Sequence, residues 1–174
     1  MAFRRTTRRF ARPRKRAIWV NIPFGAVAFT ETLGAQRLVI GEDWEAQFTG
    51  IANESAILRA VVGQITIQQT TVGTHGTTAF WGLYIQDHNA TVNPSFTTTG
   101  MSEVSWLTTG AFGTTSSISS SSTSALEATR DVNVRAKRKL TSRDSIYIAA
   151  QYGSDAAAPA GVLGGILRFL IARD

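Results

Sequence analysis

Residues 131–140 read DVNVRAKRKL, and their alternation indicates the class of fold. Apolar side chains stand at positions 132, 134 and 136, while cations stand at 135, 137 and 139. Successive side chains of a β-strand point to opposite faces of the sheet. The period of two therefore predicts a strand with one apolar face and one cationic face. Arg138 falls on the apolar side, near the expected end of the strand.

Seven further segments have the character of strands, because short apolar or alternating runs stand between glycines and polar loops. Residues 78–86 (TAFWGLYIQ) are nearly all apolar and are expected at the centre of a sheet. Gly63 interrupts the long run 56–71 and predicts a bulge or a bend there. The other predicted strands are 17–24, 26–33, 37–40, 145–152 and 162–172.

Helical signals are weak along the whole chain. One short helical turn is expected at 102–109, with Ser102 as its cap. Residues 87–100 are polar and residues 113–125 are rich in serine, so both are expected to be loops. About eight strands without a long helix predict an all-β protein. The expected fold is a single eight-stranded antiparallel jelly roll, a β-sandwich, over residues 17–174.

The charge of the chain is divided unevenly along its length. The net charge of +6 combines 18 basic with 12 acidic residues, yet residues 1–16 hold eight basic residues and no acidic one. The rest of the chain holds ten basic and twelve acidic residues. Such a division indicates an arm that binds a polyanion and a body with another role. The basic residues of the arm are Arg4, Arg5, Arg8, Arg9, Arg12, Arg14, Lys15 and Arg16.

Residues 1–16 are too rich in like charges to fold alone, and extended they would reach roughly 50 Å. Arginine pairs bidentately with phosphate, and release of counterions drives such binding. We therefore expect a nucleic-acid-binding arm. Residues 12–16 (RPRKR) also suit a nuclear localisation signal, read by an import receptor.

The cationic face of residues 131–140 has two interpretations. It is either an ordinary solvated face or the lining of the space that receives the polyanion. On the second interpretation Arg135, Lys137 and Lys139 also bind nucleic acid.

Motifs for catalysis or cofactor binding are missing, so we expect neither an enzyme nor a cofactor. Cysteine is absent, which excludes disulfides and thiolate metal sites. Neither histidine, at 75 and 88, belongs to a metal or catalytic motif. The acidic cluster Glu42, Asp43 and Glu45 is either a solvated loop or a calcium site. No apolar run is long enough for a transmembrane helix. The tryptophans at 19, 44, 81 and 106 are expected in the core or in interfaces rather than as platforms for bases.

The order of these parts resembles the capsid proteins of small viruses, particularly those of circular, Rep-encoding single-stranded DNA (CRESS-DNA) viruses. The likeness lies in three segments: RRTTRRFARPRKR at 4–16, VVGQITI at 61–67 followed by FWGLYI at 80–85, and DVNVRAKRKLTSRDSIYIA at 131–149. The likeness covers most of the chain and lies in the order of the segments and in their residue composition. The resemblance implies a jelly roll, a shell of identical subunits and an arm that faces the lumen.

The expected function is that of a capsid (coat) protein that packages a single-stranded genome, with DNA favoured over RNA. A single short domain with one arm suits the smallest icosahedral shell, about 60 copies. The resemblance places the protein in the virion and, during assembly, in the host nucleus. The alternative is a non-viral nucleic-acid-binding β-barrel protein, of ribosomal or chromatin type, with a basic tail. The net negative body favours the capsid, because proteins of the alternative class usually carry basic residues over the body as well.

Overall fold

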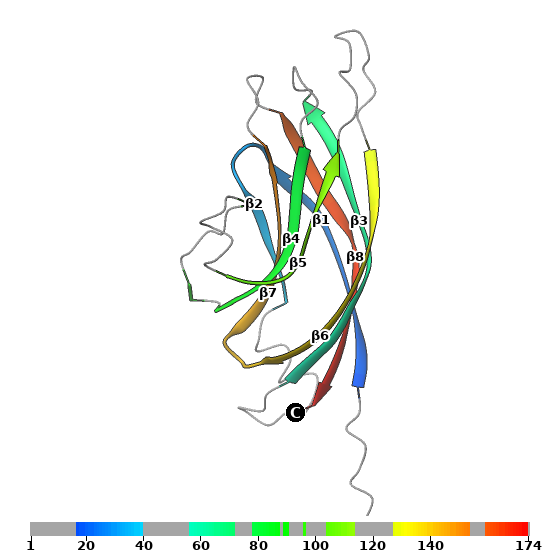
Figure 1. Ribbon diagram of the computed structural model, residues 1–174, viewed down its shortest axis with the longest axis vertical. Helices are drawn as coiled ribbons and strands as arrows, with labels where there is room; N and C mark the ends of the chain where they lie inside the picture. The colour runs from blue at the N-terminus through cyan, green and yellow to red at the C-terminus, as the bar shows by residue number, and fades with distance from the viewer. Residues whose placement is uncertain are drawn as a thin grey trace, which may run out of the picture.

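The computed structural model describes residues 17–39, 56–71, 78–87, 89–90, 96, 104–113, 127–153 and 159–173. Within these residues the chain forms two antiparallel sheets of four strands that stack face to face (Figure 1). None of the described segments is a helix with the length and apolarity needed to cross a membrane. The strands are β1 (Ala17–Phe29), β2 (Gly34–Val39), β3 (Ala56–Thr71), β4 (Thr78–Asp87), β5 (Ser105–Gly113), β6 (Glu127–Leu140), β7 (Asp144–Tyr152) and β8 (Ala160–Arg173).

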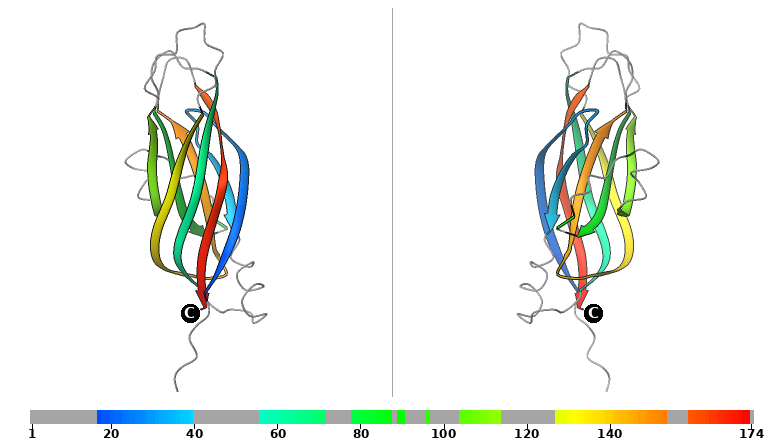
Figure 2. Two further views of the ribbon diagram at one scale, coloured as in Figure 1. Left: turned by 90° about the vertical axis from the view of Figure 1, so that its right-hand side faces the viewer. Right: turned by 90° about the vertical axis from the view of Figure 1, so that its left-hand side faces the viewer.

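The strand order confirms the predicted jelly roll. One sheet has the order β1-β8-β3-β6 and the other the order β2-β7-β4-β5. The left panel of Figure 2 shows the outward face of the first sheet, and the right panel shows that of the second. Of the described strands, only β4 and β5 follow each other within one sheet, and every other connection crosses between the sheets. This is the double Greek-key arrangement of an eight-stranded antiparallel sandwich.

The core lies between the two sheets and is built from one side of each strand. Alternation buries every second side chain along most of β3 and β8, as a period of two requires, whereas β4 and β7 are buried on both faces. Trp81 on β4 is buried, and β4 lies between β7 and β5, which confirms its predicted inner position. The fully buried apolar side chains include Leu58, Val61, Ile65, Leu83, Ile146, Ile148, Leu163, Leu167, Phe169 and Ile171.

The first strand is longer than predicted. The segments expected as two strands, 17–24 and 26–33, form the single strand β1, followed by a turn at 30–33. Gly25 and Ala26 form a bulge, because the register with β8 shifts between Phe24 and Val27. Ala26 has a φ of 57°. The bulge lets the strand bend without ending, so glycine here does not separate two strands.

The helical turn predicted at 102–109 is wrong. Residues 105–113 form β5, which pairs with β4 from Ile85↔Ser105 to Thr78↔Gly113. The local signal came from a serine before three apolar residues. Pairing with β4 overrides that weak preference, because it satisfies the backbone and brings Trp106 to 5.2 Å from Tyr84, ring centre to ring centre.

The bulge predicted at Gly63 lies four residues earlier, at Arg59. The register of β3 shifts between Leu58 and Ala60 against both of its neighbours. Gly63 instead marks a close approach of two backbones, with a φ of 154°. A Cβ at Gly63 would lie 2.1 Å from the carbonyl oxygen of Ile166, and one at Gly165 would lie 2.2 Å from that of Gln64. These two glycines therefore let β3 and β8 pair closely at the middle of the sheet.

A cluster of aromatic side chains lies on the outward face of the β2-β7-β4-β5 sheet. Tyr84 and Tyr147 stack with ring centres 5.2 Å apart, and Phe96 lies 5.0 Å from Trp106. Burial, and then the neighbouring Tyr147, raises the pKa of Tyr84 well above its usual value. On the core side, burial raises the pKa of Tyr152 to about 12.

The glycine contact between β3 and β8 gives the first prediction. We expect Gly165→Ala to lower the free energy of unfolding by more than about 2 kcal/mol, because its Cβ would overlap a backbone oxygen at a positive φ. Gly164→Ala is the matched control, since its Cβ would meet nothing nearer than 3.6 Å. Urea denaturation of both variants measures the difference. Equal stability of the two variants would contradict the close approach.

The buried tyrosines predict a loss of stability in alkali. Unfolded tyrosine ionises near pH 10, whereas Tyr152 keeps its proton in the folded protein up to about pH 12. The unfolded state therefore binds fewer protons in this window, and the free energy of unfolding should fall as pH rises through it. Tyr152→Phe removes one such group and should make the decline shallower, by about 1.4 kcal/mol per pH unit at most. Denaturation curves below and above pH 10 test this. An equally steep decline in the variant would show that Tyr152 ionises alike in both states.

Candidate nucleic-acid interface

β6 holds three of the predicted site residues on one surface. Arg135, Lys137 and Lys139 are exposed on the outward face of the β1-β8-β3-β6 sheet. Val132 and Leu140, on the other side of the strand, are buried in the core. The predicted separation of an apolar from a cationic face is therefore confirmed except at Ala136, which lines the hollow with the cations because the register with β3 shifts between Arg135 and Arg138. That this face binds nucleic acid stays a prediction.

Arg59 on β3 joins these cations, and sequence reasoning missed it. At the bulge Arg59 is the extra residue between the pairs Leu58↔Ile171 and Ala60↔Leu170. A bulge breaks the alternation, so Arg59 and Ala60 both lie on the outward side. The signal in the sequence was a lone arginine within an apolar run, at AILRAVV. We call Arg59, Arg135, Lys137 and Lys139 the basic patch.

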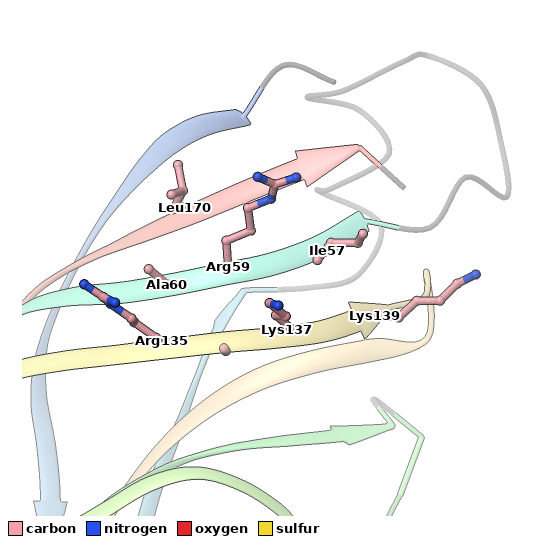
Figure 3. Close-up of a pocket in the computed structure, with 8 residues that line it drawn as sticks. Ile57, Arg59, Ala60, Arg135, Lys137, Lys139 and Leu170 are labelled. Carbon is pink, nitrogen blue, oxygen red and sulfur yellow. The ribbon is translucent and has the colours of Figure 1, made fainter. Parts of the chain in front are cut away.

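The basic patch surrounds an open hollow of about 840 Å³. Figure 3 shows side chains from β3, β6 and β8 around it, with Arg59 and Arg135 extending from neighbouring strands. Aliphatic side chains lie among the cations: Ile57, Ala60, Ala136 and Leu170. The surface thus combines cations with apolar contact area, a combination that suits a nucleic-acid strand better than a small ion.

The outward face of the β1-β8-β3-β6 sheet is strongly positive. Arg168 on β8 lies on the same face as the basic patch, so five of the ten basic residues that follow residue 16 gather there. Among the described side chains of this face, Asp131 is the one carboxylate, and it accepts a hydrogen bond from Gln64 Nε2 at 3.0 Å. The field over this face therefore attracts polyanions.

The other two cations of β6, Arg130 and Arg138, contact residues of β5 in the opposite sheet. Arg138 donates a hydrogen bond to Ser105 Oγ on β5, and Arg130 lies over the ring of Phe112 at 6.0 Å. These contacts link the edge strands of the two sheets. The predicted placement of Arg138 on the apolar side of the strand is confirmed.

The end of β6 is held by a compact turn. The carboxylate of Asp144 accepts hydrogen bonds from the backbone N–H of Thr141 at 2.7 Å and from its hydroxyl at 2.9 Å. The N–H of Asp144 returns a bond to the carbonyl of Thr141 at 3.0 Å. The turn leads the chain from one sheet to the other immediately after Lys139 and Leu140. It therefore fixes where the cationic strand stops.

The arm enters the sheet at the level of the basic patch. Ala17, the first residue of β1, pairs with Ala172, which pairs with Ile57, which pairs with Lys139. Three strand spacings separate the two ends of this row, about 15 Å. The eight basic residues of the arm lie outside the described residues.

Other predicted features lie outside the described residues as well, namely His75, His88 and the acidic cluster Glu42, Asp43 and Glu45. Within the part of the chain that the structure describes, no three acidic or histidine side chains gather into a potential metal site.

Comparison with known proteins finds likeness in structure alone. No protein-family model and no curated protein sequence matches the chain. A chain of Desmodium yellow mottle tymovirus is 13% identical over 93% of this chain and 90% of its own length, with a TM-score of 0.32. A chain of infectious bursal disease virus, Gx strain, is 12% identical with a TM-score of 0.40; the match covers 91% of this chain and 36% of the viral one. Eiger TNF from S. frugiperda is 11% identical over 87% of this chain and 91% of its own, with a TM-score of 0.34. Likenesses at these identities and TM-scores carry no argument about function.

The basic patch predicts a specific change in salt dependence. We expect Arg135→Gln with Lys137→Gln to weaken binding of a single-stranded oligonucleotide and to reduce the slope of log K against log salt by about 1.4, since each phosphate contact contributes about 0.7. Both residues are exposed, so the fold should be unchanged. Arg37→Gln is the control. Arg37 is an exposed cation on β2 in the opposite sheet, so its substitution should leave the slope unchanged. Anisotropy titrations with the full chain measure this. An unaltered slope in the double variant would support the solvated-face interpretation.

Proposed function

We propose that the protein is a viral capsid (coat) protein that assembles into a closed shell and packages a single-stranded nucleic acid. The observation that carries this proposal is one-sided charge. The outward face of one sheet holds five cations, and the arm with eight more begins at the same end of that sheet. The face also holds Asp131, and the rest of the body contains five basic and eleven acidic residues.

Cations gathered on one side of the molecule suit a subunit of a closed shell better than a freely diffusing nucleic-acid-binding protein. A subunit of a shell meets nucleic acid on one side and solvent on the other, so cations are useful on one side only. A ribosomal or chromatin protein is surrounded by nucleic acid and usually carries cations over more of its surface. On this proposal the basic patch and the arm line the lumen of the shell. The arm contributes eight positive charges per copy, and the patch contributes four cations held on β3 and β6.

The surface of the subunit also has features that neighbouring copies would cover. Among the described residues, large apolar side chains are exposed at Ile18, Phe80 and Ile166. The edge strands β1, β6, β2 and β5 each have one side without a strand partner among the described residues. Exposed edges and apolar side chains of this kind favour contacts between copies.

The smallest icosahedral shell is the form proposed. About 60 copies can each occupy an equivalent environment. Eight arm charges per copy then bring about 480 positive charges to the lumen, enough to neutralise a strand on the order of several hundred nucleotides, with mobile cations supplying the balance for longer ones. We propose DNA rather than RNA as the packaged strand, and assembly in the host nucleus. The basis for both is the resemblance of the sequence to capsid proteins of CRESS-DNA viruses, together with the RPRKR run that would serve a nuclear import receptor.

Particle mass after nuclease treatment tests this function. A subunit of 18.8 kDa predicts a protein shell of roughly 1.1 MDa for about 60 copies. Mass photometry combined with electron microscopy should show uniform closed particles. A shell about three times heavier would mean inequivalent subunits. A stable monomer or small oligomer in mild salt would contradict the capsid function and favour a nucleic-acid-binding protein of another kind.

A variant without residues 2–16 separates the shell from its cargo. The truncation leaves β1 to β8 intact, so the variant should fold and retain the subunit surfaces. Its particles should protect far less nucleic acid from nuclease, because eight charges per copy are lost. Normal cargo in the truncated particles would show that the arm is not the packaging element.

A further inference from the structure

Trp19 is the most exposed tryptophan of the described residues, with 43% of its surface accessible. It belongs to β1 and pairs with Leu170, whose side chain lines the hollow of the basic patch. Trp19 therefore lies on the outward face of the β1-β8-β3-β6 sheet. The sequence-based expectation for tryptophans was the core or an interface, and for Trp19 the core is now ruled out. The accessible part of this indole is available for contact with a molecule outside the subunit.

Arg168 accompanies Trp19 on this face. Its guanidinium carbon lies 5.2 Å from the centre of the Trp19 ring, which is within the range of a cation–π contact. Arg168 is two residues from Leu170 along β8, so it reaches Trp19 diagonally across the strand pair. Arg168 thus lies over one face of the exposed indole and adds a positive charge and a planar guanidinium at the same place.

The pair and the basic patch form one continuous surface. Trp19, Leu170, Ala60 and Arg135 follow one another across the four strands, as the pairing of β1, β8, β3 and β6 shows. The row begins with an aromatic ring, passes over two aliphatic side chains and ends at a cation. Its length is three strand spacings, about 15 Å. A short stretch of nucleic acid lying along this row could place a base at one end and a phosphate at the other.

We propose that Trp19 and Arg168 form a stacking site for an unpaired base, so that this face binds single-stranded nucleic acid in preference to duplex. This inference deepens the proposed function and depends on it, because it requires that the basic patch bind nucleic acid. Cations alone attract single strands and duplexes alike. Aromatic side chains can stack only on bases that are not already stacked and paired within a helix. Trp19 thus supplies the discrimination that the basic patch lacks.

Salt separates the two contributions in the full chain. Contacts with phosphate weaken as salt rises and set the slope of log K against log salt, whereas stacking persists at high salt. Trp19→Leu keeps an apolar side chain on β1 and removes the aromatic face. Trp19→Phe restores a smaller one. Phe80→Leu is the matched control, because Phe80 is exposed to a similar extent, 37%, on the other sheet.

The probes are a labelled oligo-dT and a duplex of equal length, titrated by anisotropy over a range of salt concentrations. We expect Trp19→Leu to weaken binding of the single strand about tenfold at high salt, with an unchanged slope, and to leave duplex binding unaltered. Trp19→Phe should recover most of the affinity, and Phe80→Leu should match the wild type. Circular dichroism and thermal unfolding show whether each variant is folded.

Three outcomes would overturn the stacking site. One is a Trp19→Leu variant that binds the single strand as tightly as the wild type does. Another is an equal loss for single strand and duplex. The third is normal binding by the variant together with failure to form particles, which would make Trp19 a contact between copies. Each leaves the proposed function standing, since that depends on particle mass and on the slope change caused by Arg135→Gln with Lys137→Gln.

Discussion

The position of β8 between β1 and β3 is the constraint on which the rest of the structure depends. The last strand of the chain pairs along its length with the first strand on one side and with the third on the other. The pairing is close at the centre, where Gly63 and Gly165 each leave room for a carbonyl of the opposite strand. The β1-β8-β3-β6 sheet is therefore complete only when β1 and β8, which lie far apart in the sequence, have come together.

This pairing also creates the candidate interface. Without β8, β1 would have no link to β3, and Trp19 would not share a surface with the cations of β6. With β8 in place, the start of β1, the Trp19–Arg168 pair and the basic patch lie on one face of the sheet, whose strands the left panel of Figure 2 shows side by side. The turn closed by Asp144 then leads the chain from the cationic strand into the opposite sheet. Fold and charge thus agree, since the same strand order that buries the core gathers five cations on one side.

Short-range patterns predicted the strands well and their limits less well. The alternation at 131–140 identified β6, its buried side and its cationic side, because successive side chains of a strand point to opposite faces of the sheet. The predicted number of strands was correct although two errors cancelled. Gly25 was interpreted as a break within β1, and β5 was interpreted as a loop with a helical turn. Both errors arose where pairing with a distant strand, and not local preference, decided the backbone.

The sequence by itself determined an all-β body, a charged arm and a strand with one cationic face, because composition and alternation are properties of short segments. Tertiary structure alone decided that Arg59 joins the basic patch, since this depends on a bulge whose position is set by two neighbouring strands. It alone placed Trp19 and Arg168 on the same face, although they are far apart in the chain. Strand order brings together residues that are distant in the sequence, and the pattern within a short segment does not specify which strands will be neighbours.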